Sequence, residues 1–344
     1  MSLSRSAHRS PAYQPRLAWA AAAGTTWVFV LIMLGAFTTS IGAGMVFPDW
    51  PLSNGSLNPE GWLTDLAMFA EHSHRLSAGL MSLITLGIAL AVWFKDSRPW
   101  LKKLAWFAVG LVFAQAIVGG LRVLMDHLHV EMVNTSVGRL FAMVHATLAQ
   151  IYVCTLLAIS IALSRPWIRP SFPRHNESAT WRRTAVICTV LLVLQLAIAA
   201  VMRHSFAGTA IPTFPWSTPQ GALLPADWNF RVAIHFAHRA MALVLTVALV
   251  VLAARIVRDP GAPGAVKSCA WGLLGLLALQ ITLGAASVLT YRNPYYTTAH
   301  VLVGALTLAL CFGLTWWSFR PVMESGRAVS TPLHAARPQT SSVT

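Results

Sequence analysis

Glu71-His72-Ser73-His74-Arg75 is the stretch that decides the fold, because these five polar residues run directly into an uncharged apolar segment, Leu76 to Phe94. A helix that spans a bilayer needs about 20 apolar residues, so this segment is predicted to cross a membrane. A carboxylate, two imidazoles and a guanidinium are then placed at the mouth of a membrane helix. Polar groups at such positions are costly and are usually kept for function.

A second stretch of the same kind, Ile234-His235-Phe236-Ala237-His238-Arg239, also opens an apolar run, and its His-Arg pair follows the first after 164 residues. Further matches support a repeat: Gln115 and Gly119 with Gln280 and Gly284, His145 with His300, and Phe47-Pro48 with Phe214-Pro215. The chain is therefore predicted to contain two copies of one unit.

The composition is that of a membrane protein. Of the 344 residues, 56% are hydrophobic and only 10% are charged, whereas a soluble domain has about 25% charged residues. The net charge of +14 does not indicate nucleic-acid binding, because the basic residues fall in short clusters between apolar runs and not on one face or tail. The four cysteines, Cys154, Cys188, Cys269 and Cys311, all lie in apolar runs, so we expect buried thiols without disulfides.

Eight charge-poor segments predict an all-α integral membrane protein with eight transmembrane helices. They cover residues 17–40, 76–94, 104–121, 140–164, 184–202, 240–254, 268–291 and 293–319. Four helices in each copy predict two tandem, pseudo-symmetric four-helix bundles related by an axis along the membrane normal. The first segment is longer than the roughly 7–15 apolar residues of a cleavable signal, so we read it as a retained anchor, with a short transit peptide as the alternative.

The distribution of basic residues predicts the orientation. The amino terminus, the alternate loops and the carboxyl terminus hold 18 of the 25 Lys and Arg residues, so both termini are predicted to be cytoplasmic. The expected division is a basic cytoplasmic tail (1–16), a first bundle (17–164), a cytoplasmic linker (165–183), a second bundle (184–320) and a cytoplasmic tail (321–344).

Four histidines occupy repeat-related positions on this topology. His74, His145, His238 and His300 lie near the outward ends of the second, fourth, sixth and eighth helices, so each bundle has two. Neutral imidazoles that face one another across a bundle can hold a haem iron from both sides. Zinc usually needs three or four ligands, so pairs in an apolar interior favour haem. A single membrane histidine can also be a hydrogen-bonded packing residue, but four at matching positions favour ligands.

Glu71 precedes His74 by three residues, so the two side chains lie on the same face of the helix. The second copy has His235 at the position of Glu71. Glu71 is either a first-turn acid favoured by the helix dipole or a sign that one bundle holds a permanent cofactor while the other performs chemistry. Arg75 and Arg239 are either partners of haem propionates or interfacial anchors.

The other histidines are not expected to be ligands. His72 lies about 200° around the helix from His74, so both cannot face one site. His127, His129, His175 and His204 are predicted to be surface residues.

Together these residues resemble the haem A synthase family, over roughly residues 20–320. The resemblance rests on Glu71-x-x-His74-Arg75, its His238-Arg239 echo, the two later histidines and the doubled four-helix unit. It implies oxidation of a ring methyl of haem O to a formyl group, through an alcohol, for terminal oxidases. It also implies that His238 and His300 ligate a resident haem b, that His74 and His145 hold the substrate haem O, and that Glu71 is the catalytic carboxylate.

One feature departs from the family pattern. Many members have a cysteine pair in the outward loop after the first helix, whereas residues 41–66 contain no cysteine. This difference puts a thiol-dependent step in doubt and is read as a subgroup difference.

The chemistry limits the mechanism. An iron with two histidine ligands transfers electrons but has no free position for oxygen. Methyl oxidation then needs stepwise electron removal with attack by water, or temporary loss of one histidine. Stepwise removal releases protons, which Glu71 could accept.

The expected partners are haem O, membrane lipid, a haem O synthase, terminal oxidase assembly partners and an electron acceptor that no motif identifies. The expected location is the bacterial plasma (inner) membrane, with the haem sites toward the outer face. Two other functions stay open: a di-haem b cytochrome that oxidises quinol, which would not need the Glu71 asymmetry, and a haem carrier or assembly factor.

Overall fold

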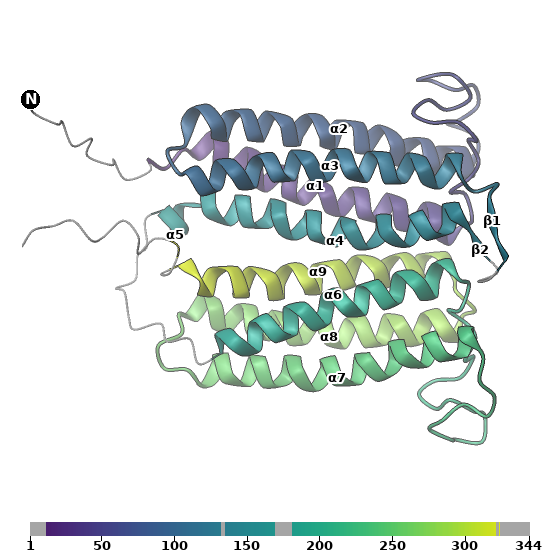
Figure 1. The fold of residues 1–344 in the computed structure, drawn as a ribbon. Helices are drawn as coiled ribbons and strands as arrows, with labels where there is room; N and C mark the ends of the chain where they lie inside the picture. Colours follow the sequence, from purple (N-terminus) through teal and green to yellow (C-terminus); the bar gives the residue numbers. More distant parts are fainter. Residues whose placement is uncertain (1–11, 132–134, 169–180, 321–322, 324–344) are drawn as a thin grey trace, which may run out of the picture.

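Eight long helices run side by side in the computed structural model, which describes residues 12–131, 135–168, 181–320 and 323 (Figure 1). They are α1 (Pro15–Ser40), α2 (Leu66–Lys95), α3 (Pro99–Leu124), α4 (Val137–Leu163), α6 (Arg182–His204), α7 (Phe230–Arg258), α8 (Gly264–Leu289) and α9 (Pro294–Ser318). Each is long and apolar enough to cross a membrane, which confirms the prediction of an all-α, multi-pass membrane protein.

Three small elements complete the described fold. A short helix, α5 (Arg165–Ile168), follows α4. Between α3 and α4, strand β1 (His129–Val130) pairs antiparallel with β2 (Thr135–Ser136). This strand pair has no counterpart among the elements that the sequence predicts. It lies at the same end of the molecule as the long connections 41–65 and 205–229, and we call this end the loop end (Figure 1).

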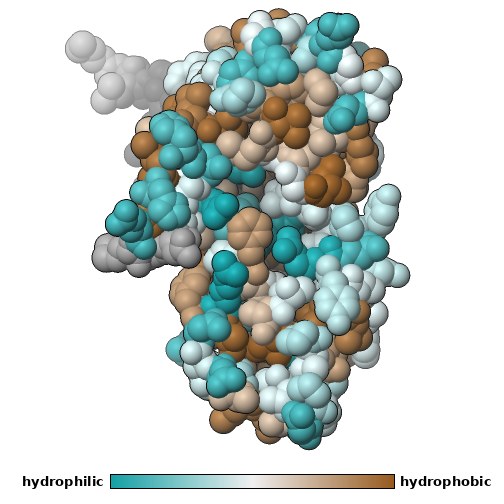
Figure 2. Space-filling model, turned by 90° about the vertical axis from the view of Figure 1, so that its right-hand side faces the viewer, coloured by the Kyte–Doolittle hydropathy of each residue, from teal (hydrophilic) through white to brown (hydrophobic). Residues whose placement is uncertain are grey.

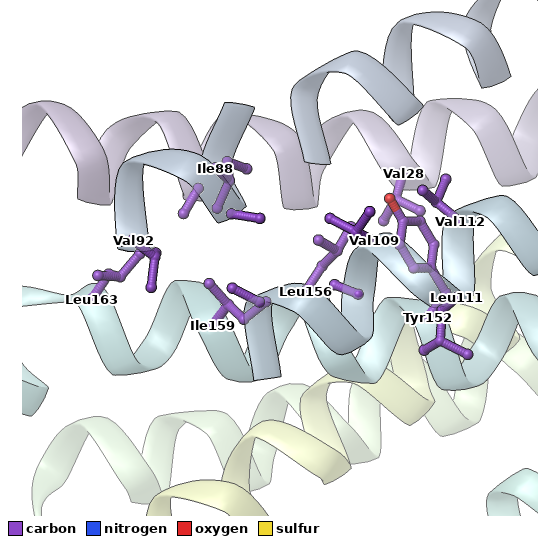
Figure 3. Packing of buried hydrophobic residues seen from close by; sticks show 14 of the residues in the cluster. Val28, Ile88, Val92, Val109, Leu111, Val112, Tyr152, Leu156, Ile159 and Leu163 are labelled. Carbon is purple, nitrogen blue, oxygen red and sulfur yellow. The ribbon is translucent and has the colours of Figure 1, made fainter. Parts of the chain in front are cut away.

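The helices form two groups of four, α1–α4 above and α6–α9 below in Figure 1. Each group has its own cluster of buried apolar side chains. In the first group Ile88, Val109, Tyr152 and Leu156 interdigitate between the helices (Figure 3). Lipid is as apolar as these side chains, so close packing holds membrane helices together more than exclusion of water does. The groups meet along a seam made by α1 and α4 on one side and by α6 and α9 on the other.

Helices α2 and α7 begin earlier than their apolar runs suggest. The Asp65 side chain accepts a hydrogen bond from the Met68 N–H and caps α2, and Asn229 caps α7 in the same way. The Glu71–Arg75 stretch therefore lies inside α2 and not at its start. The alternative that made Glu71 a first-turn acid is wrong, because the first turn of α2 contains no acid.

Polar contacts tie the opposite end together. Arg98 is fully buried and donates to the Asp96 carboxylate within the α2–α3 turn. Its Nη1 also donates to the Ala162 carbonyl at the end of α4, at 2.8 Å. These contacts fix the α2–α3 hairpin against α4, which carries one of the four candidate histidines.

Candidate functional site

The second histidine pair has the spacing of two ligands of one metal. The rings of His238 on α7 and His300 on α9 have centroids 6.3 Å apart and planes inclined by 69°. A metal held about 2 Å from each of two opposed ring nitrogens places the centroids roughly 6 Å apart. The distance between the two rings is therefore compatible with one metal ion between them.

A neighbouring helix orients one ring of this pair. The Nδ1 atom of His300 lies 3.1 Å from the Gln280 carbonyl oxygen on α8. A proton on Nδ1 donates to that carbonyl and leaves Nε2 as the lone-pair donor, which is how ligating histidines are usually held. The Nδ1 atom of His238 is buried and has no hydrogen-bond partner in the described part of the chain.

The first pair repeats one feature, the carbonyl contact of the ring on the fourth helix of the bundle. The Nδ1 atom of His145 on α4 lies 3.1 Å from the Gln115 carbonyl oxygen on α3. His74 on α2 is near enough to His145 for their charges to interact. The ring distance thus places His238 beside His300, while His74 and His145 are related by an electrostatic interaction, and the prediction that each pair holds a haem stays a prediction.

Three glycines make room for the rings. A Cβ atom added at Gly35 would lie 2.7 Å from Cε1 of His74, and one at Gly119 would lie 3.1 Å from Cε1 of His145. At Gly284 the distance to Cε1 of His300 would be 3.0 Å. The sequence matched Gly119 with Gly284 without a reason, and the reason is this close approach of helix backbone to imidazole.

Unsatisfied polar atoms lie in the same helices. The side-chain Oε1 atoms of Gln115 and Gln280 are buried, and neither has a hydrogen-bond partner among the residues that the structure describes. A buried acceptor left without a partner costs about 1–3 kcal/mol, so each of these two helices has an acceptor that a hydrogen-bond donor would satisfy.

The candidate ligands come in pairs and not in larger clusters. Within the described ranges, no three residues of the types His, Cys, Asp and Glu lie close enough to hold a metal ion. The four cysteines are free thiols; two of them are buried, as expected, and the other two are half-buried. Pairs of imidazoles in an apolar bundle fit haem, which needs two axial ligands, better than zinc, which needs three or four.

Glu71 binds a loop. Its carboxylate is buried; Oε2 accepts the N–H groups of Val46 at 2.7 Å and Phe47 at 3.2 Å, while Oε1 accepts Nη2 of Arg75 at 2.6 Å. Arg75 also donates to the carbonyl oxygens of Phe47, Asp49 and Leu52. This loop clamp fastens residues 46–52 to α2.

The second bundle has the same clamp with an imidazole in place of the carboxylate. The Ile211 N–H donates to Nδ1 of His235 at 3.2 Å. Arg239 donates to the carbonyl oxygens of Ile211, Thr213 and Trp216. These three carbonyls follow those of Phe47, Asp49 and Leu52 by 164 residues, the spacing of the two arginines.

This register corrects one sequence match. The counterpart of Phe214-Pro215 is Trp50-Pro51, and both of these peptide bonds are cis. The sequence match with Phe47-Pro48 was displaced by three residues. It rested on the identical Phe-Pro dipeptides, whereas the carbonyl contacts of the two arginines give an offset of 164 residues. The prediction that Arg75 and Arg239 bind haem propionates stays a prediction, and their described hydrogen bonds give both a second role in holding the loops.

Asp49 organises the first loop further. Its carboxylate accepts the N–H groups of Asn54 at 2.8 Å and Gly55 at 2.7 Å. Desolvation alone would raise the pKa of Asp49, but these backbone donors and the nearby charge of Arg75 together lower the pKa below its ordinary value.

The remaining histidines mostly follow the predictions. His72 is buried against Phe47 and Trp62, with Nδ1 3.0 Å from Oγ of Ser53, so it faces the loop. His127 and His129 are exposed, as predicted, and His175 lies outside the described residues. His204 is half-buried at the end of α6, so its assignment to the surface was wrong.

Two arginines near the histidine pairs were missed as site residues. Arg203 on α6 donates through Nη2 to the Ala36 carbonyl at 2.6 Å and to Oγ of Ser40 at 2.8 Å, both on α1. Arg122, in the last turn of α3, lies against Gly44, where a Cβ atom would collide with its guanidinium. The sequence could have indicated both arginines, because they belong to the set of loops and helix ends that contains few basic residues.

Comparison with known proteins agrees with this architecture. Relatives named "Heme A synthase" include those of Staphylococcus saprophyticus (24% identical over 308 residues, 87% of this chain and 93% of the relative) and Macrococcus caseolyticus (24% over 308 residues, 88% and 95%). That of Listeria welshimeri is 26% identical over 287 residues, 82% of this chain and 88% of the relative. The family model COX15-CtaA, described as cytochrome oxidase assembly protein, matches residues 63–312. The chain thus belongs to the COX15-CtaA family of cytochrome oxidase assembly proteins.

Proposed function

We propose that this membrane protein is a haem A synthase, which oxidises a ring methyl of haem O to a formyl group, through an alcohol, for the assembly of terminal oxidases. The observation that carries the proposal is the pair of repeat-related histidine sites, one with ring centroids 6.3 Å apart, in a chain whose relatives are named "Heme A synthase". An oxidoreductase of this type acts on a C–H bond of the porphyrin substrate.

His238 and His300 are proposed to hold a resident haem b. The ring spacing, the Gln280 carbonyl that orients His300 and the unpartnered Nδ1 of His238 support this assignment. A haem with two histidine ligands supplies one-electron transfer. The Gln280 carbonyl orients the His300 ring, and the proposed site lies between α7 and α9.

His74 and His145 are proposed to hold haem O as substrate. The Gln115 carbonyl orients His145 as Gln280 orients His300, and Gly35 and Gly119 admit the two rings. Glu71 lies one turn from His74 on α2, and this bundle alone has an acid there. This chemical difference between the bundles supports the proposal that the reaction takes place in the first.

Glu71 is proposed as the catalytic carboxylate, as proton acceptor or as the group that positions the substrate. If water supplies the oxygen, conversion of a methyl to a formyl group releases four electrons and four protons, so an acceptor near the ring is needed. Three N–H groups hold this carboxylate in one place. Arg75 and Arg239 remain candidates for the haem propionates, because a guanidinium binds a carboxylate with two parallel hydrogen bonds.

The proposed setting is the bacterial plasma membrane, with the loop end and both sites toward the outer face and both termini in the cytoplasm. Proposed partners are a haem O synthase that delivers the substrate, the oxidase that receives the product, and an electron acceptor.

One experiment tests the proposal against a di-haem cytochrome and a haem carrier. The chain is co-expressed with a haem O synthase, and the extracted pigments are analysed by mass spectrometry. A synthase yields the formyl haem, a carrier returns haem O unchanged, and a cytochrome retains unmodified haems. Absence of the formyl haem, with the protein present in the membrane, would refute the proposed function.

A further inference from the structure

Polar contacts cross the seam between the bundles at the loop end. Arg203 of α6 binds Ala36 and Ser40 of α1, and Oγ1 of Thr298 on α9 lies 3.2 Å from Oγ of Ser40. The guanidinium of Arg139 on α4 stacks 4.9 Å from the ring centroid of Phe206, just after α6. Figure 2, which looks onto the loop end, shows a hollow between the two halves with hydrophilic side chains around it.

Positive charge gathers at this seam. Arg203 is near enough to Arg122 and Arg292 for their charges to interact, and His204 is near Arg122, Arg203 and Arg139. We call Arg122, Arg139, Arg203 and Arg292 the seam arginines. All four are half-buried. Clustered like charges out of bulk water are unfavourable unless an anion compensates them.

The described acids do not supply that anion. None of the seam arginines forms an ion pair with a carboxylate of the described residues. Glu71 and Asp126 are near enough to Arg122 to interact electrostatically, but Glu71 is bonded to Arg75 and Asp126 accepts the hydroxyl of Ser136.

Two of the seam arginines interact electrostatically with the histidine pairs. Arg122 is within electrostatic reach of both His74 and His145, and Arg203 is within reach of His300. No acceptor in the described ranges takes a hydrogen bond from the Arg122 guanidinium, or from Nη1 or Nε of Arg203. Arg75 and Arg239, in contrast, give several of their donors to loop carbonyls.

We propose that Arg122 and Arg203 bind porphyrin carboxylates, one for each site: Arg122 binds a propionate of the porphyrin held by His74 and His145, and Arg203 binds a propionate of the porphyrin held by His238 and His300. The inference rests on the proposed function, because it assumes a porphyrin in each pair. Both arginines lie at the loop end of their helices, so both porphyrins are bound with that propionate toward the hollow between the bundles.

The redox potential of the resident haem reports the Arg203 contact. A propionate paired with a guanidinium is neutralised and stays ionised, so it neither stabilises the ferric form nor takes up a proton on reduction. In Arg203→Gln the unpaired anion favours ferric haem. The reduction equilibrium then shifts at least tenfold toward the oxidised form, which for one electron is about 59 mV, and the midpoint becomes dependent on pH near neutrality.

Three variants separate charge from packing. Arg203→Lys keeps the charge and restores most of the potential. Ser40→Ala removes one seam hydrogen bond but keeps Arg203, so the midpoint stays at the wild-type value. Arg231→Gln removes an exposed arginine in the first turn of α7, at the same end of the molecule but outside the seam arginines, and also leaves it unchanged. Unchanged potential and pH dependence in Arg203→Gln, or an equal shift in Arg231→Gln, would overturn the Arg203 assignment.

The Arg122 contact is tested with two probes, ferric protoporphyrin IX and its dimethyl ester, titrated into a His300→Ala background that leaves only the first pair intact. The diacid binds more tightly than the diester, and Arg122→Gln lowers affinity for the diacid about tenfold while affinity for the diester changes little. Equal loss for both probes would contradict a carboxylate contact. If the real ligand of Arg122 is an anionic lipid headgroup, phosphatidylglycerol vesicles abolish the difference in affinity between the wild-type and Arg122→Gln proteins, whereas esterification of the porphyrin does not. That outcome also refutes the inference.

Failure of the inference is distinguishable from failure of the proposed function. Wild-type protein that purifies without a low-spin haem spectrum would refute the haem sites themselves. Wild-type protein with that spectrum, together with insensitive Arg203→Gln and Arg122→Gln variants, would refute only the carboxylate contacts.

Discussion

Gly284→Ala tests the proposed haem site through packing alone, without touching a ligand. The added Cβ atom would lie 3.0 Å from Cε1 and 3.5 Å from Nδ1 of His300, whereas ordinary contacts begin at 3.4 Å. The ring must therefore move by about 0.4 Å while its Nδ1 is tied to the Gln280 carbonyl. Such overpacking costs about 1–3 kcal/mol. We expect haem retention to weaken by one to two orders of magnitude, since about 1.4 kcal/mol is tenfold.

The assay is the ratio of haem to protein after purification, from the pyridine haemochrome, with the low-spin signal in electron paramagnetic resonance as a measure of axial geometry. Gly275→Ala is the matched control, because it adds the same methyl group to α8 with no atom within 4 Å. The control should retain the wild-type haem content. A Gly284→Ala protein with the haem content and spectrum of Gly275→Ala would refute the assignment of His300 as a ligand.

Three further predictions concern other variants and the effect of pH. Glu71→Gln should lower the yield of haem A at least tenfold. An amide does not accept a proton at this position, and it does not replace the charge-assisted hydrogen bond to Arg75, which is worth about 1.5–3 kcal/mol. A normal yield of haem A in the extracted pigments would contradict this role of Glu71. His300→Ala should abolish the resident low-spin haem, whereas His145→Ala should keep it and lose haem A formation; optical spectra of purified protein decide between these outcomes. The loop around Asp49 should stay protected from proteolysis as pH is lowered to 5, because its pKa lies below the ordinary 3.8 and its stabilising contacts are lost only as pH falls through that lowered pKa; loss of protection already at pH 5 would argue against these contacts.

The helices were predictable because length and polarity decide them. Each of the eight charge-poor segments lies largely within a helix of the structure. Their starts were less predictable, since Asp65 and Asn229 begin α2 and α7 well before the apolar residues. A capping side chain adds polar turns that the apolar pattern does not contain.

The histidine pairs were suggested by four repeat-related residues, and the structure places the rings of His238 and His300 6.3 Å apart across the second bundle. The partners of Glu71 were not predictable, because they are backbone N–H groups of a proline-containing loop that shows no periodic pattern. The place of Arg203 depends on the packing of one bundle against the other, which the sequence of a single helix does not encode.

The two loop clamps bear on why the first bundle has an acid. His235 accepts a backbone N–H of its loop from the position equivalent to Glu71, and Arg239 reaches the same three carbonyl positions as Arg75. An imidazole is therefore sufficient to hold the loop, and the clamp alone does not require a carboxylate. A Glu71→His variant should keep the loop of residues 46–52 in place, measured by its protection from proteolysis, yet form haem A poorly. If Glu71→His made haem A as well as the wild type, the acid would serve only the loop, and the chemical difference between the two bundles would have to lie elsewhere.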